Sequence, residues 1–394
     1  MLSSRTPQSR PGVVLQHTPS QRRWSTRLAF LAAGIAMSAW AALVPFAKAR
    51  LQLEEAQLGL LLLCLGIGSL LAMPLTGMLA SRFGCRPVIL CSGAVGCLVL
   101  PVLALAPTPL LQGLALLVFG AAIGALDVAM NIQAVIVEKE QGGALMSGFH
   151  GLFSVGGFAG AGGMALLLGF GFGPLAACSL VAALAAVALV VAAPHLLRTA
   201  PAAERDAPFF VMPHGAVILI GLLCFLIFLA EGAVLDWSAV FLTGVTGLAA
   251  GQGGLGYAVF AVAMTAGRLT GDRVVRRWGG MRVMLVGGLA TAVGFFTVVL
   301  APLPAVALLG FLLVGLGASN IVPVLFTAAG NQKDMPVGLA VSAITTIGYA
   351  GILAGPALIG FVSHAVGLHL AFAGLGVAAL LVAGSSRLLA RRQA

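Results

Sequence analysis

The chain has 394 residues, of which 60% are hydrophobic and 8% are charged. Soluble domains carry about 25% charged residues, so this composition excludes a soluble globular protein and indicates a chain embedded in a lipid bilayer. The net charge of +10 does not indicate a nucleic-acid partner, because the basic residues are scattered over short loops and tails.

Twelve apolar stretches follow one another along the chain, and each is long enough to cross a bilayer as an α-helix, which takes about 20 residues. None of them alternates apolar and polar residues, as the strands of a membrane β-barrel do. The predicted fold class is therefore an all-α membrane protein with twelve transmembrane helices. They are expected at residues 28–48, 57–79, 88–106, 109–137, 148–170, 173–197, 214–242, 253–271, 282–301, 304–330, 338–363 and 367–388.

A basic, polar tail of residues 1–27 precedes the first stretch. Because the Ala47-Lys48-Ala49 sequence lies at its end, this stretch resembles a secretory signal with a cleavage site. A signal, however, has an apolar region of only about 7–15 residues. We therefore interpret the first stretch as a retained helix, with a cleaved signal as the alternative.

The distribution of positive charge predicts the orientation of the chain. Of the 21 Lys and Arg residues, only Lys48 and Arg50 fall in a loop that follows an odd-numbered helix. The other 19 lie in the tails or in loops that follow even-numbered helices, with Arg268 counted at a helix end. Cytoplasmic loops carry the excess of Lys and Arg in membrane proteins. We therefore expect both termini, including the C-terminal tail 389–394, in the cytoplasm, and a bacterial inner membrane as the location.

The second half of the chain repeats the first at an offset of 195 residues. Arg82-Phe83-Gly84 aligns with Arg277-Trp278-Gly279, and three further glycines of the first half also meet glycines of the second: Gly120 with Gly315, Gly156 with Gly351, and Gly160 with Gly355. Matches in order over several helices indicate two six-helix bundles of like orientation, residues 28–197 and 214–388. A cytoplasmic linker, residues 198–213, is expected between them.

The turn between the second and third helices carries the motif Gly77-x-Leu79-Ala80-x-Arg82-x-Gly84-x-Arg86. It resembles the G-x-L-A-D-R-x-G-R-R motif of the major facilitator superfamily, whose two parallel six-helix halves have the same architecture. Ser81 replaces the family's aspartate, whereas the second copy, from Gly267 to Arg273, keeps an acid. The resemblance implies a gate between alternating states, with candidate gating residues Gly77, Ser81, Arg82, Gly84, Arg86, Asp272, Arg273, Arg277 and Gly279.

Three longer segments carry a narrower resemblance. DVAMNIQAVIVE (127–138), SGFHGLFSVGG (147–157) and EGAVLDWSAVFL (231–242) resemble bacterial YbjJ-like inner-membrane permeases. More distantly, they are similar to fucose-permease-type sugar–proton symporters. Those symporters commonly place an acid on the first helix as well as on the fourth, and the first helix here has none.

Three acids lie within predicted helices: Asp127, Glu231 and Asp236. A charge inside the bilayer costs about 3 kcal/mol or more unless it is solvated or paired, so it marks a functional site by default. Asp127 lies well inside the fourth helix and shares a helical face with Gly124 and Asn131. We predict that Asp127 carries the coupling proton, with Glu231 as the second candidate; a structural acid paired across helices is the alternative. Asp236 fits the outer membrane interface.

In the superfamily the first, fourth, seventh and tenth helices line the central cavity. The resemblance therefore implies substrate contacts from polar and aromatic residues on these helices and on the neighbouring eleventh. An aromatic ring can stack on a solute and amides can fix its hydroxyls, although each polar residue could instead bridge two helices. The candidate residues are Trp40, Asn131, Gln133, Glu231, Asn320 and Tyr349. His150 on the fifth helix is a further candidate contact, but its place near the cytoplasmic end of that helix favours an ordinary residue of the membrane interface.

Signals of catalysis are missing from the sequence. The three lysines, Lys48, Lys139 and Lys333, do not follow a glycine, so no phosphate-binding loop with G-K-[ST] is present. The six cysteines show no metal-ligand spacing. We expect no enzyme activity, no catalytic residue, no cofactor and no metal.

The sequence favours a secondary active transporter that moves a small polar solute by alternating access. Exporters of the superfamily often carry G-x-x-x-G-P on the fifth helix, where this chain has Gly156-x-x-x-Gly160-Ala161. Proton symport is therefore preferred over efflux of drugs or metabolites. A transport-inactive sensor or scaffold on the same fold is the alternative from another class, and the protein is expected to be a monomer.

Overall fold

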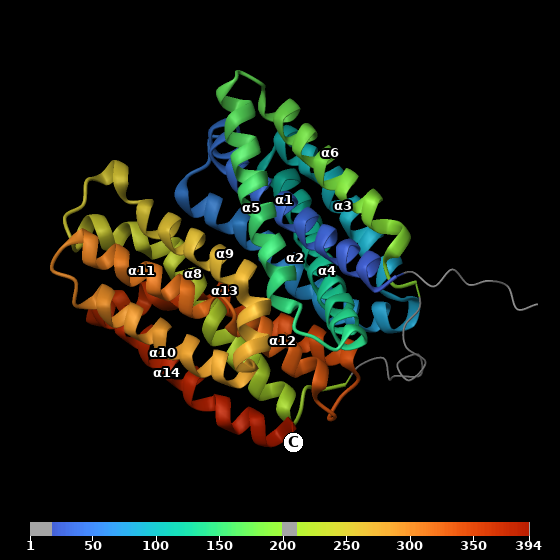
Figure 1. Ribbon diagram of the computed structural model, residues 1–394. Helices are drawn as coiled ribbons and strands as arrows, with labels where there is room; N and C mark the ends of the chain where they lie inside the picture. The colour runs from blue at the N-terminus through green and yellow to red at the C-terminus, as the bar shows by residue number, and fades with distance from the viewer. Residues whose placement is uncertain (1–17, 199–210, 394) are drawn as a thin grey trace, which may run out of the picture.

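The computed structural model describes residues 18–198 and 211–393, so most of the expected linker lies outside the described residues. The described residues fold into helices and connecting turns without a β-strand. The first half comprises α1 (Pro19–Leu51), α2 (Glu55–Phe83), α3 (Cys85–Leu105), α4 (Pro109–Gln141), α5 (Met146–Gly169), α6 (Pro174–Ala192) and the short η1 (Ala193–His195). The second half comprises α8 (Ala216–Gly244), η2 (Ala250–Gln252), α9 (Leu255–Trp278), α10 (Gly280–Val299), α11 (Pro304–Ala318), α12 (Ile321–Asn331), α13 (Val337–Val366) and α14 (Leu368–Gln393) (Figure 1).

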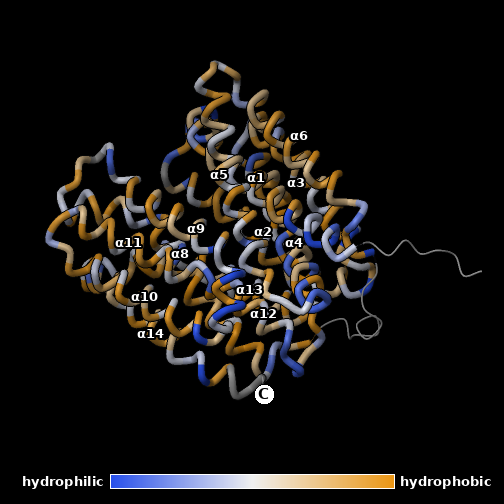
Figure 2. The backbone as a smooth tube through the Cα atoms, viewed as in Figure 1, coloured by the Kyte–Doolittle hydropathy of each residue, from blue (hydrophilic) through white to orange (hydrophobic). Residues whose placement is uncertain are grey.

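These helices have the lengths and apolar surfaces of membrane spans. Eleven spans among the described residues are long and apolar enough to cross a bilayer, when α11 and α12 are taken as one span. The twelfth is α9, which carries five charged residues from Arg268 to Arg277. Figure 2 shows hydrophobic residues along most of each helix and hydrophilic ones gathered near the ends of α4, α12 and α13. The structure confirms an all-α membrane fold.

Several helices differ from their expected bounds. α1 begins at Pro19, within the expected tail, because Thr18 forms a capping box with Gln21. α14 likewise continues to Gln393, through most of the expected tail 389–394. The expected tenth helix is interrupted at Ser319 and Asn320.

Equivalent helices pack in the same way in the two halves. α1 packs against α5 as α8 does against α13, and α2 packs against α4 as α9 does against α11. Glycines allow this close approach: a Cβ atom on Gly156 of α5 would overlap the carbonyl of Leu31, and one on Gly351 of α13 would overlap the carbonyl of Phe225. The duplication read from the sequence is therefore a duplication of packing.

The repeated turn has the same backbone in both copies. Gly84 ends α2 with φ +84° and ψ +164°, and Gly279 ends α9 with φ +78° and ψ +148°. Each N–H donates to the carbonyl four residues back, Ala80 or Val275, at 2.9 Å. Side chains rarely adopt these angles, so the turn selects glycine.

The two halves meet chiefly through α2 with α13 and α5 with α9, and α12 also touches α4 and α5. We call the side on which α1 begins and α14 ends the terminal side. Figure 1 shows the bundles coming together toward this side and spreading apart in the opposite direction. The contacts between the halves therefore decide which face of the protein is closed.

Candidate functional site: the interface between the two halves

The N-terminus of α5 is held by a carboxylate from α4. One oxygen of Glu138, Oε2, accepts hydrogen bonds from the backbone N–H groups of Leu145 at 2.7 Å and Met146 at 2.8 Å. The first N–H groups of a helix have no partner within the helix and carry partial positive charge. The other oxygen of Glu138 accepts from the Thr327 hydroxyl of α12 at 2.5 Å. This carboxylate therefore caps α5 and also reaches the second half.

A second carboxylate reaches the same helix end from the other half. Asp272 of α9 accepts a hydrogen bond from the N–H of Gly148 at 2.8 Å, and its side chain interacts electrostatically with Arg27 and Arg276. Arg276 also donates to the carbonyl of Ala144 at 3.0 Å. The predicted gating residue Asp272 thus joins the halves, with basic residues of both halves around it.

The contact between α2 and α13 is neutral. The Ser342 hydroxyl donates to the carbonyl of Met73 at 2.6 Å across the interface. Gly77 lies so close to α13 that a Cβ atom on it would be 2.7 Å from Ser342 Cβ and 2.8 Å from the carbonyl oxygen of Gly338. Ser81, which stands where the family has aspartate, donates to Gly77 of its own helix at 2.9 Å. The α2–α13 contact is therefore held by close packing and a neutral hydrogen bond, without an ionic contact between these described residues.

The other predicted gating arginines lie at the ends of helices. Arg82 and Arg277 are exposed at equivalent positions in the last turns of α2 and α9, and Arg273 is exposed one turn earlier on α9. The backbone N–H of Arg86 donates to the carbonyl of Leu197 at 2.8 Å, which ties the repeated turn to the end of the first half. A gating role for these arginines stays a prediction.

Asp127 and Asn131 form a polar pair near the middle of α4. The Asn131 amide donates to the Asp127 carbonyl oxygen at 2.9 Å and lies 3.4 Å from its carboxylate. Asn131 is 1% exposed, and its Oδ1 has no hydrogen-bond partner within the described residues. Tyr349 of α13 interacts electrostatically with Asp127, so the pair faces the second half of the protein. The structure thus brings three of the predicted site residues together.

Glu231 lies near the middle of α8 and forms an ion pair with Arg268 of α9. The guanidinium Nη2 is 3.5 Å from Glu231 Oε1. Arg268 is only 7% exposed and also contacts Ser154 of the first half at 3.1 Å and the Ser319 carbonyl at 3.4 Å. Sequence reasoning missed Arg268, because it counted this arginine among the charges at helix ends. The sequence did contain a signal: Arg268 falls within the expected span 253–271, which marks it as a charge inside the membrane.

Two other predicted substrate contacts, Asn320 and Gln133, form hydrogen bonds within the protein. Asn320 sits in the break between α11 and α12 and donates to the carbonyl of Gly267 at 3.1 Å, while its Oδ1 has no partner within the described residues. Gln133 is fully buried in the first half, donates to Thr26 at 3.3 Å and accepts from the Leu197 N–H at 3.1 Å. Gln133 therefore connects α4 with the ends of α1 and α6, apart from the other predicted residues.

Aromatic residues occupy the remaining space between the helices. Trp40 is 4% exposed in the core of α1. Tyr349 places its ring edge-on to Phe228 of α8, with ring centroids 6.3 Å apart. The His150 ring of α5 lies between Phe30 of α1 at 5.2 Å and Phe326 of α12 at 5.5 Å. His150 therefore packs between the two halves of the protein, which differs from the membrane-interface position expected from the sequence.

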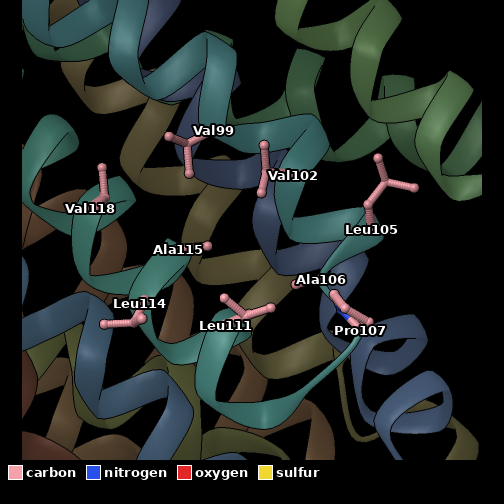
Figure 3. A pocket seen from close by; sticks show the side chains of 9 residues that line it. All are labelled: Val99, Val102, Leu105, Ala106, Pro107, Leu111, Leu114, Ala115 and Val118. Carbon is pink, nitrogen blue, oxygen red and sulfur yellow. The ribbon is translucent and has the colours of Figure 1, made fainter.

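A crevice of about 390 Å³ lies elsewhere, on the surface formed by α3 and α4 (Figure 3). Val99, Val102 and Leu105 of α3 face Leu111 and Leu114 of α4 across it. Its apolar lining offers no charged or hydrogen-bonding side chain to a polar solute, so it takes no part in the candidate site.

Two six-helix bundles, apolar toward the lipid and polar where they meet, define a multi-pass membrane transporter. Residues 28–334 match the family described as the Major Facilitator Superfamily. An uncharacterised MFS-type transporter of Yersinia pestis is 58% identical over 93% of this chain and 95% of its own length. The chain belongs to the Major Facilitator Superfamily. It is a transporter and not an enzyme, as the sequence predicted.

Further relatives and solved structures agree with this assignment. The membrane protein MosC of Rhizobium meliloti is 32% identical over 94% of this chain and 91% of its own length. The fucose:proton symporter of E. coli has a TM-score of 0.73 at 18% identity, over 93% of this chain and 98% of that one. The human organic anion transporter MFSD10 has a TM-score of 0.72 at 18% identity, over 94% and 100%. These solved structures share the fold with the present chain.

Proposed function

We propose that the protein is a proton-coupled symporter of a small polar solute in a bacterial inner membrane. It works by alternating access as a monomer, with the terminal side facing the cytoplasm. The observation that carries the proposal is Asp127, a carboxyl group in the middle of a membrane helix with an unpaired amide oxygen of Asn131 beside it. The fold alone does not select the solute, because solved structures with this fold include both sugar symporters and an organic anion transporter.

Asp127 has the surroundings of a proton carrier. Within residues 18–198 and 211–393, no ion pair joins it to a cation, in contrast to Glu231. A carboxylate without a counter-ion is costly inside a membrane, and its neutral form is the cheaper one. The group therefore loses its proton most readily when one side of the protein opens to water. A carrier that loads on one side and unloads on the other needs this property.

The solute would bind between the halves, where polar atoms are left without partners. The atoms of described residues that lack a hydrogen-bond partner include Asn131 Oδ1 on α4, Glu231 Oε1 on α8 and Asn320 Oδ1 beside α9. Buried polar atoms normally find a partner, so a solute with several hydroxyl or N–H donors satisfies this set. Trp40 of α1 and Tyr349 of α13 would supply aromatic surface for the solute.

The terminal side closes through contacts that can form and break. Hydrogen bonds from Gly148 to Asp272 and from Thr327 to Glu138 join the halves there. Each contact links one bundle to the other, and each bundle keeps its own internal packing without it. Rocking of the two bundles around a fixed site is the usual form of alternating access in this architecture. In the state described here the terminal side is closed.

The test is Asp127→Asn in proteoliposomes, after thermal-shift screening against sugars, nucleosides and amino acids has identified a substrate. The variant keeps the shape of the side chain and removes its proton. We expect it to abolish accumulation driven by a proton gradient while counterflow exchange and substrate binding persist. Glu231→Gln is the comparison, and we expect it to weaken binding more than coupling. Gradient-driven accumulation by Asp127→Asn at the wild-type level would falsify the assignment, and outward pumping would indicate efflux.

A further inference from the structure

Arg268 of α9 is a buried cation that contacts both halves of the protein. Its Nη1 donates to the Ser154 hydroxyl of α5 at 3.1 Å, and its Nε donates to the Ser319 carbonyl at 3.4 Å. Its Nη2 lies 3.5 Å from Glu231, yet Glu231 Oε1 has no hydrogen-bond partner within the described residues. One guanidinium is therefore shared between a hydroxyl of the opposite half and a carboxylate of its own half.

The contact with Ser154 is built for a cation. The Ser154 hydroxyl donates its hydrogen to the carbonyl of His150 at 3.3 Å, so its oxygen presents lone pairs to Arg268. Hydrogen bonds to charged donors are stronger than neutral ones. This bond also crosses the interface between α5 and α9, where the halves meet on the terminal side. It must break whenever α5 and α9 move apart.

We infer that Arg268 is a positioning residue that frees Glu231 for the solute when the terminal side is closed and captures it when that side opens. The inference rests on the proposed function, because it uses alternating access. With the terminal side closed, Ser154 and Ser319 hold the guanidinium, and Glu231 keeps an oxygen for a donor group of the solute. When α5 leaves α9, the released Nη1 can join Nη2 beside Glu231, and the closer ion pair displaces the solute.

The choice of arginine fits this role. A guanidinium has five N–H donors in a planar fork, so it can contact Ser154, Ser319 and Glu231 at the same time. A lysine ammonium in the same place is a single point charge and cannot span the three positions. A buried arginine in a membrane helix is costly, so a purely structural link between α8 and α9 does not require one.

Competition between Ser154 and Glu231 for one cation gives predictions with opposite signs. Glu231→Gln removes the charge that draws Arg268 away from Ser154, so it favours the closed terminal side. Ser154→Ala removes the contact across the interface, so it favours the open one. Because both changes act through Arg268, their effects are not additive.

The experiment measures the distance between spin labels at Lys139 and Arg282, two exposed terminal-side residues on opposite halves. The six native cysteines are replaced, and no solute or proton gradient is present. We expect Ser154→Ala to raise the open-to-closed ratio about fivefold and Glu231→Gln to lower it about fivefold, within the usual range for coupling between sites. The change in the open-to-closed ratio of the double variant should differ from the product of the two single changes.

Two further variants separate this role from simple packing. Arg276→Ala removes another bond across the same interface, to Ala144, but does not involve Glu231. Its effect should therefore multiply with that of Glu231→Gln. Arg268→Lys keeps the charge and should cancel the response to both Ser154→Ala and Glu231→Gln. Ser154→Ala, Glu231→Gln and their double variant form a cycle that needs no change at Arg268. Poor folding of Arg268→Lys therefore does not leave the inference untested.

A Glu231→Gln protein that shifts toward the open terminal side, or a double variant whose effects simply multiply, overturns the inference. Failure of the proposed function has a different signature. It appears as proton-driven accumulation by Asp127→Asn, whereas the label distances are recorded without transport. Asp127→Asn should leave the effects of Ser154→Ala, Glu231→Gln and their double variant unchanged, because Asp127 lies on α4 and, within the described part of the chain, shares no hydrogen bond or ion pair with Arg268.

Discussion

Replacement of Asp272 by asparagine tests whether one buried carboxylate holds the terminal side closed. Asp272 is 8% exposed and accepts the N–H of Gly148, in the first turn of α5, at 2.8 Å. Asparagine keeps an oxygen at the same place, so the hydrogen bond survives and only the charge is lost. The Gly148 N–H then faces a neutral group, although Glu138 still caps the N–H groups of Leu145 and Met146, and Arg27 and Arg276 lose an electrostatic partner.

The size of the effect follows from the change of charge. A hydrogen bond to a charged group contributes about 1.5–3 kcal/mol, against about 0.5–1.5 kcal/mol for a neutral one. A negative charge at a helix N-terminus contributes about 0.3–1 kcal/mol. The two values describe overlapping parts of one interaction, so we take about 1.5 kcal/mol, or roughly a tenfold change in an equilibrium constant. The terminal side should open about tenfold more often in Asp272→Asn.

The assay is the distance distribution between labels at Lys139 and Arg282, with Asp334→Asn as the matched control. Asp334 also caps a helix N-terminus, since it accepts the N–H of Ala216 at 2.6 Å, but both residues belong to the second half. Asp334→Asn should lower the thermal stability and leave the open-to-closed ratio unchanged. Equal ratios for the wild type and Asp272→Asn would show that packing alone closes the gate, and the electrostatic argument would then be wrong.

Two more predictions concern the repeated turn and the orientation. Gly84→Leu should destabilise the protein by about 1–3 kcal/mol, because leucine strongly disfavours these backbone angles, and thermal unfolding measures this loss. The variant should also slow transport more than it weakens substrate binding, which rates of substrate exchange measure. An unchanged exchange rate argues against a gating turn. A cysteine at Arg198 should react with a membrane-impermeant reagent only from the cytoplasm, because basic residues gather on that side; labelling of intact cells from outside contradicts the proposed orientation.

Much of the fold follows from the sequence because the bilayer leaves few alternatives. A helix is the structure that satisfies all backbone groups within one segment, so each apolar stretch has one plausible outcome. The repeated glycines were equally informative, since Gly84 and Gly279 share a backbone conformation. Helix ends were less predictable: Thr18 and Gln21 extend α1 into a polar segment, because a helix can continue into water after it leaves the lipid.

The candidate site was predictable only in part, because a residue type does not reveal its partner. Asp127 and Asn131 could be paired from their spacing on one helix. The partner of Glu231 could not, since Arg268 lies on another helix and was assigned to the basic ends. Gln133 shows the same limit: this amide, on a helix expected to line the cavity, is hydrogen-bonded to Thr26 within its own half, and its contact with a solute stays a prediction. Contacts between helices decide these cases, and spacing along the chain does not record them.

Arg50 illustrates the same limit for the rule of positive charge. It is one of two basic residues that the sequence places on the opposite side, and it donates to the carbonyls of Leu103 and Ala104 and to the side chain of Gln112. The last carbonyls of a helix lack partners and carry partial negative charge, so a cation is stabilised at the end of α3. The exception to the rule therefore has a local cause and does not weaken the predicted orientation.

The two contacts of the proposed gate differ in charge: the α2–α13 contact is neutral, and the α5–α9 contact contains buried charges. The motif in α2 has lost its acid to Ser81, and its partner surface on α13 is a neutral contact through Gly77 and Ser342. The copy in α9 has kept Asp272, and it lies on the same helix as Arg268. Neutral close packing resists separation in the same way whatever is bound, whereas buried charges respond to any change in their partners. In the proposed mechanism, a signal from the solute or the proton would therefore reach the gate through α9, and the α2–α13 contact would supply closure that does not depend on charge.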